Sequence, residues 1–93
     1  VLGTQLLRAA MSVGANYRAA CRARSDADFI NKLKIVEEES DESLFWMEML
    51  VEAGFVPEAR VAALMAEGDE IVAMTVASIK TLRTRQSSIV NRK

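Results

Sequence analysis

Apolar residues recur at alternating spacings of three and four along almost the whole chain, and this periodicity restricts the fold most strongly. Such spacing places apolar side chains on one stripe of an α-helix, whereas a half-buried strand needs alternation at every second residue. The chain has only one proline and four glycines, so few residues interrupt helices. The periodicity therefore predicts an all-α protein built from a few long helices.

The periodicity is broken at two places, which predicts three helices. Their expected bounds are residues 2–23, 26–53 and 57–84. The connections are about two and three residues long, and connections this short make neighbouring helices antiparallel. We therefore expect an antiparallel up-and-down helical bundle in a single domain over residues 1–86, followed by a frayed, basic C-terminal tail over residues 87–93.

Both breaks carry helix-end signals. The Ser25-Asp26-Ala27-Asp28 segment resembles a capping box, because a hydroxyl acceptor precedes acids in the first helical turn. Gly54 is predicted to end the second helix in a left-handed conformation, with Phe55 folding back onto the last turn. Pro57 is predicted to begin the third helix, since the first helical position tolerates a missing N–H.

The first predicted helix carries two adjacent apolar stripes, which indicates contacts from two directions. The stripes consist of Leu2, Leu6, Ala9, Val13, Asn16 and Ala20, and of Leu7, Ala10, Gly14, Tyr17 and Cys21. Gly14 lowers helix stability by up to about 1 kcal/mol relative to alanine, so we expect close packing there. The amide of Asn16 is expected to fix the register between helices, with a ligand contact as the alternative.

In the second predicted helix, Ser40 and Ser43 interrupt the apolar stripe, which marks a narrow helix crossing or a small polar patch. Trp46 lies beside the same stripe. Large aromatic side chains in such positions often mark contacts between subunits, and packing against a helix outside this chain is the alternative. Tyr17, Trp46 and Asn16 are therefore the candidate packing or oligomer contacts.

The available side chains restrict the chemistry. The chain has no histidine, the commonest general base and metal ligand, and one cysteine, Cys21, which cannot form an internal disulfide. The longest apolar run, residues 61–66, is far short of the roughly 20 residues of a membrane helix. We therefore expect a cytoplasmic protein that is not an enzyme and has no cofactor, metal, membrane contact or small-molecule substrate.

The one cluster that could hold a hard cation is acidic. It consists of Glu37, Glu38, Glu39, Asp41 and Glu42. Consecutive helical residues point about 100° apart, so these carboxylates cannot all converge on one ion. We expect the cluster to be solvated or to face an interface, and an enzyme or metal site there is the alternative.

The net charge of −1 conceals three blocks of charge. Residues 1–34 carry a net +4, residues 35–70 a net −10 and residues 71–93 a net +5. Blocks of opposite sign on neighbouring helices attract one another modestly. The alternative is an arginine-rich face that meets nucleic acid, and its candidate residues are Arg18, Arg22, Arg24 and Lys32. A dedicated nucleic-acid-binding domain usually has a basic net charge, which this chain lacks.

Several segments resemble the bacterial four-helix bundle proteins. The similar segments cover residues 5–18, 22–29, 32–39 and 43–46, and the most specific is Arg-Ala-x-x-Ser-Val-x-Ala-Asn at residues 8–16. These proteins are also called intervening-sequence proteins, because some are encoded within insertions in large-subunit ribosomal RNA genes. The resemblance extends from residue 2 to about residue 84, which is nearly the whole chain.

The resemblance implies a four-helix protomer, of which this chain would hold three helices and lack the family's first. It also implies a homo-oligomer, a pentamer in known members, and no established enzymatic activity. A related branch, the accessory proteins of diversity-generating retroelements, binds nucleic acid through a basic surface together with a reverse transcriptase partner. Ala19 stands where many members have glutamate, which weighs against that role here.

Two functions are therefore expected. The leading hypothesis is a non-catalytic, oligomeric four-helix bundle protein that acts as a scaffold or accessory subunit. The alternative is an RNA-, DNA- or ribosome-associated binding protein that uses the arginine-rich helix face.

Overall fold

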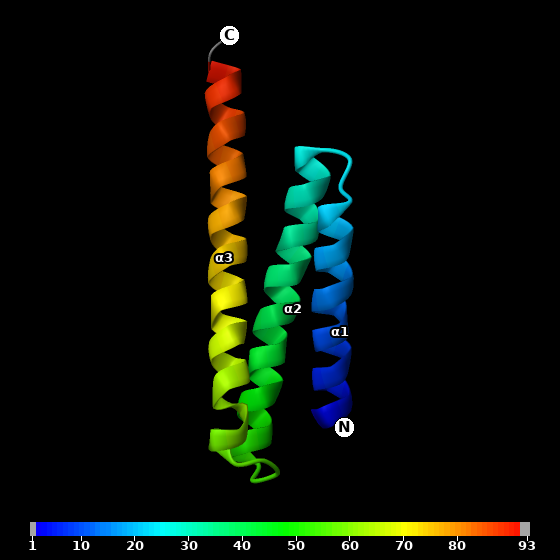
Figure 1. Ribbon diagram of the computed structural model, residues 1–93, viewed down its shortest axis with the longest axis vertical. Coiled ribbons are helices and arrows are strands. Elements are labelled where there is room, and N and C mark those ends of the chain that lie inside the picture. The colour runs from blue at the N-terminus through cyan, green and yellow to red at the C-terminus, as the bar shows by residue number, and fades with distance from the viewer. Residues whose placement is uncertain (1, 92–93) are drawn as a thin grey trace.

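The computed structural model describes residues 2–91, and this part of the chain is all-helical, with no strand (Figure 1). The helices are α1 (Leu2–Cys21), α2 (Asp26–Glu52) and α3 (Glu58–Asn91). They lie side by side, with α2 between α1 and α3 (Figure 1). Among the described residues, α2 packs against both outer helices, whereas α1 and α3 do not pack against each other. The all-α prediction is confirmed, and the helices form an open layer.

The N-terminal end of α2 has the predicted cap. Ser25 is extended, with φ −154° and ψ 163°, and its Oγ accepts a hydrogen bond of 3.1 Å from the Asp28 backbone N–H. The acids Asp26 and Asp28 occupy the first turn, where they face the positive end of the helix dipole. This cap reverses the chain between α1 and α2 at what we call the upper end of the layer (Figure 1).

The C-terminal end of α2 agrees with the prediction in its backbone but not in its side chain. Gly54 has a φ of +80°, and its N–H donates to the Val51 carbonyl at 3.0 Å. The Phe55 N–H donates to the Leu50 carbonyl at 3.1 Å, which completes a Schellman motif. Phe55 is 73% exposed, so the prediction that it folds back was wrong. These two backbone hydrogen bonds cap the C-terminal end of α2, so the cap does not require contact with the Phe55 ring.

The third helix is longer than predicted. It continues to Asn91, although the sequence pattern predicted an end near residue 84 and a frayed tail from residue 87. The chain contains no glycine or proline after Gly68, so nothing in the sequence interrupts the helical backbone there. The last two residues of the predicted tail, 92 and 93, lie outside the described residues.

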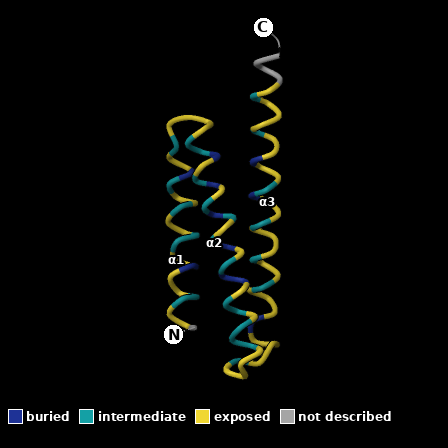
Figure 2. Tube along the Cα trace, turned by 180° about the vertical axis from the view of Figure 1, so that it is seen from behind, coloured by how far each residue is buried: buried dark blue, intermediate teal, exposed yellow. Residues whose placement is uncertain are grey.

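The best-buried side chains lie on the helix sides that face α2 or are part of it (Figure 2). A cluster at the upper end joins all three helices, and its members are Ala20, Ile30, Leu33 and Ile79. Nearer the other end of α1, Ala9 is fully buried. The small alanines let α1 approach α2 closely, as expected for the first apolar stripe of α1.

Close helix approach occurs at Gly68 and not at Gly14. A Cβ atom at Gly68 would lie 2.8 Å from Cδ2 of Leu44, so α2 and α3 approach closely there. A Cβ atom at Gly14 would meet no other atom within 4 Å. The expected close packing at Gly14 is therefore not found among the described residues.

We predict that two glycine-to-alanine changes shift stability in opposite directions. Gly14→Ala should raise the free energy of unfolding by up to about 1 kcal/mol, because alanine favours the helix and the site has room. Gly54→Ala should lower it by about 1 kcal/mol or more, because alanine is strained at positive φ. Urea unfolding followed by circular dichroism measures both, and equal effects of the same sign would contradict this account.

Candidate functional site

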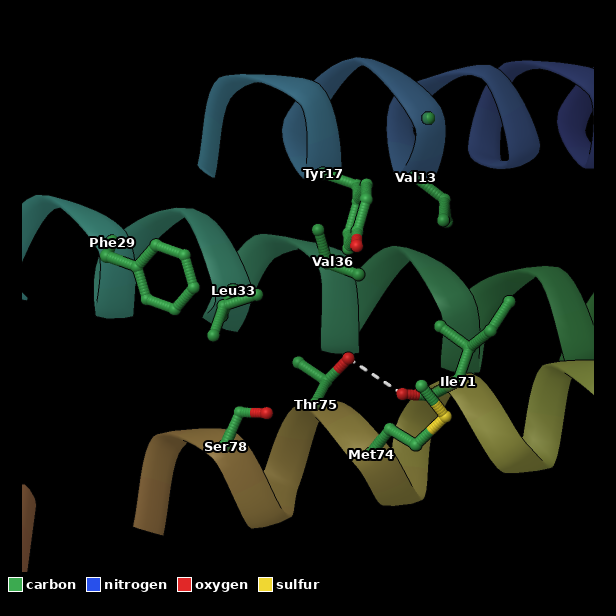
Figure 3. Close-up of a pocket in the computed structure, with 10 residues that line it drawn as sticks. Val13, Tyr17, Phe29, Leu33, Val36, Ile71, Met74, Thr75 and Ser78 are labelled. Atoms are coloured by element: carbon green, nitrogen blue, oxygen red, sulfur yellow. Dashed lines mark hydrogen bonds between the residues drawn. The ribbon is translucent and has the colours of Figure 1, made fainter. Parts of the chain in front are cut away.

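An apolar groove runs along α2 between α1 and α3. Its upper part has a volume of about 470 Å³ and is shown in Figure 3. Its walls and floor there include Val13 and Tyr17 of α1, Leu33 and Val36 of α2, and Ile71 and Met74 of α3. Its lower part has about 230 Å³ and includes Ala10, Ser40, Ser43, Leu64, Glu67 and Gly68. We call these two continuous parts the groove, and they share Val13 and Ile71.

The walls of the groove expose large apolar side chains. Met74 is 67% exposed, Tyr17 58% and Leu64 54%. In Figure 3, Tyr17 and Val13 extend from α1 toward α2, and Met74 and Ile71 extend from α3. Large contiguous apolar patches on a protein surface often mark sites of interaction with another molecule. Tyr17, a predicted packing contact, is thus part of a surface that nothing within the described chain covers.

Among the hydroxyl groups that line the groove, those of Thr75 and Ser43 bond to their own helices. The Thr75 hydroxyl donates to the Ile71 carbonyl at 2.7 Å (Figure 3). The Ser43 hydroxyl donates to the Glu39 carbonyl at 2.8 Å. The Ser40 hydroxyl oxygen is buried and has no hydrogen-bond partner among the described residues. Both serines that the sequence marked therefore lie in the floor of the groove, and only Ser40 is left unsatisfied.

An ionic network joins α1 to α2. Arg8 Nη2 lies 2.5 Å from Glu42 Oε1, and Arg8 Nη1 lies 3.5 Å from Glu39 Oε2. The indole N–H of Trp46 donates to the same Glu42 oxygen at 3.1 Å. These bonds lower the pKa of Glu42, with the Arg8 hydrogen bond as the main cause and Trp46 as the second. The network thus favours the ionised carboxylate.

Sequence reasoning did not identify Arg8. Its partner Glu42 is 34 residues away, so no spacing within one helix indicates the pair. The acidic cluster that we considered for a cation instead directs two of its members toward this arginine. Within residues 2–91, no group of three or more aspartate, glutamate, cysteine or histidine side chains is placed to hold a metal ion.

The other predicted contacts have local partners. The Asn16 amide donates to the Ser12 carbonyl at 2.9 Å and to the Ser12 hydroxyl at 3.1 Å, both within α1. These bonds join no second helix, in contrast to the register role that the sequence suggested. Trp46 is half-buried, and its ring meets Phe45 edge-on with centroids 4.9 Å apart. Trp46 thus packs within α2 and is also part of the Arg8 network.

The predicted basic residues all lie near the upper end. Arg18 is in the last turn of α1, Arg22 and Arg24 are exposed in the connection, and Lys32 is half-buried near the start of α2. The C-terminal half of α3 reaches the same end, since Ile79 belongs to the upper cluster. Three helices thus bring basic residues to one end of the molecule. No helix in the described part of the chain is long and apolar enough to cross a membrane.

Comparisons with known proteins identify a family and a solved structure with a fold similar to that of this chain. A family described as 23S rRNA-intervening sequence protein matches residues 1–77. A crystal structure of a protein with unknown function from the S23 ribosomal protein family, from Bacteroides thetaiotaomicron, has 36% sequence identity and a TM-score of 0.82. The match covers 86% of this chain and 74% of that one. No curated protein matches the chain. The comparisons thus supply a family and a fold but no activity.

We predict that acidification weakens the link between α1 and α2. Because the pKa of Glu42 is lowered below its ordinary value of 4.5, the stabilisation is present above that value and is lost as the pH falls through the lowered pKa. Glu42→Gln should remove this part of the pH dependence, and Glu38→Gln, an exposed neighbour, should keep it. Urea unfolding followed by Trp46 fluorescence measures the effect. The same pH dependence in wild type and Glu42→Gln would contradict the assignment.

Proposed function

Because this chain belongs to the 23S rRNA-intervening sequence protein family, we propose that it acts without catalysis as a scaffold or accessory subunit. In this proposal a fourth helix covers the groove and completes an up-and-down bundle, and several copies assemble into a homo-oligomer. The family resemblance favours a pentamer. The observation that carries the proposal is the groove itself, whose walls expose Tyr17, Leu64 and Met74.

The physical argument is that one layer of helices leaves an apolar side without a partner. A helix in the groove would contact α1, α2 and α3 at once, so it would bury apolar surface of all three helices. Burial is worth about 25 cal/mol per Å², which favours association through this surface over exposure to water. In solutions of this chain, we expect the helices of neighbouring copies to cover the groove.

We predict that the chain is larger than its 10.2 kDa monomer at micromolar concentration. Met74→Arg, in the groove wall, should shift the mass toward the monomer, because a charge there opposes burial. Ala73→Arg places the same side chain on an exposed site of α3 outside the groove and should leave the mass unchanged. Light scattering after size exclusion gives the mass. A monomeric wild type would end the proposal.

The second candidate function is binding of RNA or DNA through the upper end. The supporting observation is that α3 extends to this end and adds Arg85, which lies 3.4 Å from Asp26. Phosphate groups attract such clustered arginines, and the attraction falls with salt because counterions are released on binding. This use of the upper end leaves the groove free for a helix.

We predict that replacing Arg18, Arg22 and Arg24 together by alanine weakens binding to single-stranded RNA. The slope of log affinity against log salt should become shallower by about 2, since about 0.7 is lost for each phosphate contact. Arg60→Ala is the control, because Arg60 is exposed near the start of α3, at the lower end. Fluorescence anisotropy at several salt concentrations measures the slope. Unchanged affinity of the triple variant would exclude this function.

A further inference from the structure

The lower part of the groove differs from the upper part because a buried hydroxyl, that of Ser40, and a carboxylate, that of Glu67, line it. Ser40 is 3% exposed, and its buried hydroxyl oxygen has no hydrogen-bond partner among the described residues. Among the described residues that line the groove, Glu67 is the only charged one. Both lie at the same level, Ser40 in the floor and Glu67 in the α3 wall. An occupant that is apolar throughout would leave the Ser40 hydroxyl unsatisfied and the Glu67 carboxylate beside an apolar surface.

The side chains at this level are small, which favours a helix as the occupant. Ala10 and Ser43 line the groove beside Ser40, so another backbone can approach closely here. A helix satisfies its own backbone hydrogen bonds, whereas an extended peptide would bury unpaired N–H and C=O groups against apolar walls. The groove therefore favours a helical occupant over an extended one.

We propose that the groove binds an amphipathic α-helix that places one arginine at the level of Ser40 and Glu67. A guanidinium has five N–H donors in a planar fork, so it can donate to the Glu67 carboxylate, and to the Ser40 hydroxyl as well once that buried side chain turns toward the groove. Apolar residues three, four and seven positions away would meet Val13, Ile71 and Met74 in the upper part. This inference rests on the proposed function, in which a helix covers the groove, and it adds the chemistry that sets the register of that helix.

The proposal predicts a specific order of preference at one position of the occupant. Arginine satisfies both Ser40 and Glu67. Citrulline has the same shape without the charge, so it can donate hydrogen bonds but attracts Glu67 less. Glutamate has no proton to donate when ionised and is repelled by Glu67. The expected order of affinity is therefore arginine, citrulline, glutamate.

The test uses three fluorescein-labelled helical peptides that share one leucine- and alanine-rich face. They differ only at a central position, which is arginine, citrulline or glutamate. Fluorescence anisotropy with the full 93-residue chain at low salt should show the arginine peptide binding about two- to fivefold more tightly than the citrulline peptide. Circular dichroism should show that each bound peptide is helical.

Protein variants identify the groups responsible. Glu67→Gln should remove the preference for arginine over citrulline, because it keeps the shape and loses the charge. Ser40→Ala should weaken the arginine and citrulline peptides alike, since both lose a hydrogen bond. Glu70→Gln is the matched control on the same helix outside the groove, and it should keep the full preference.

The outcomes separate the two proposals. Binding without a preference for arginine, or with a preference that Glu67→Gln leaves intact, overturns the arginine assignment and leaves the helix in the groove standing. Absence of binding by all three peptides up to about 1 mM overturns the arginine assignment. If the chain in the same samples is an oligomer, the proposed assembly still stands; if it is a monomer, the proposed function is overturned as well.

Discussion

The structure depends on α2 being packed on two sides at once. Small residues make this possible, with Ala9 and Ala20 on α1 and Gly68 on α3. The two packed sides leave a third apolar side of α2, with Val36 and Ser40, facing the space between the outer helices. Domains are built from at least two packed layers of secondary structure, because each helix must bury its apolar stripe. A single layer of three helices therefore leaves an apolar surface in the groove that a further element can cover.

Charge contributes to the arrangement of the helices more than to the strength of their packing. Arg8 links α1 to Glu42 of α2, and Arg85 links α3 to Asp26 at the upper end. Exposed ion pairs are worth about 0–1 kcal/mol each, so they cannot replace the apolar contacts. The Arg8 pair joins the acidic middle of the sequence to the basic N-terminal segment. The Arg85 pair joins the basic C-terminal segment to one of the two acids within the N-terminal segment.

The sequence predicted the features that depend on local backbone chemistry and did not predict those that depend on distant partners. Ser25 and Gly54 were recognised because a cap and a left-handed turn restrict residue type within a few positions. Arg8 was missed, since its partners lie on another helix. The predicted end of α3 is too early, because a polar helix without glycine or proline continues after the apolar periodicity is lost. The groove itself exists because the described residues of α1 and α3 do not contact each other, and periodicity within one helix does not specify such contacts.

The hydroxyl groups of the groove distinguish the kinds of occupant that could complete the layer. Thr75 and Ser43 bond to their own helices, so an apolar surface can cover them at little cost. Ser40 has no such bond among the described residues, so an occupant without hydrogen-bonding groups would leave its hydroxyl unpaired. A helix with one polar residue at this level would hydrogen-bond to the Ser40 hydroxyl, and its own backbone groups would stay hydrogen-bonded within the helix. Because only one level of the groove offers a charged residue among the described residues, such a helix would bind in one register, which the proposed scaffold role requires.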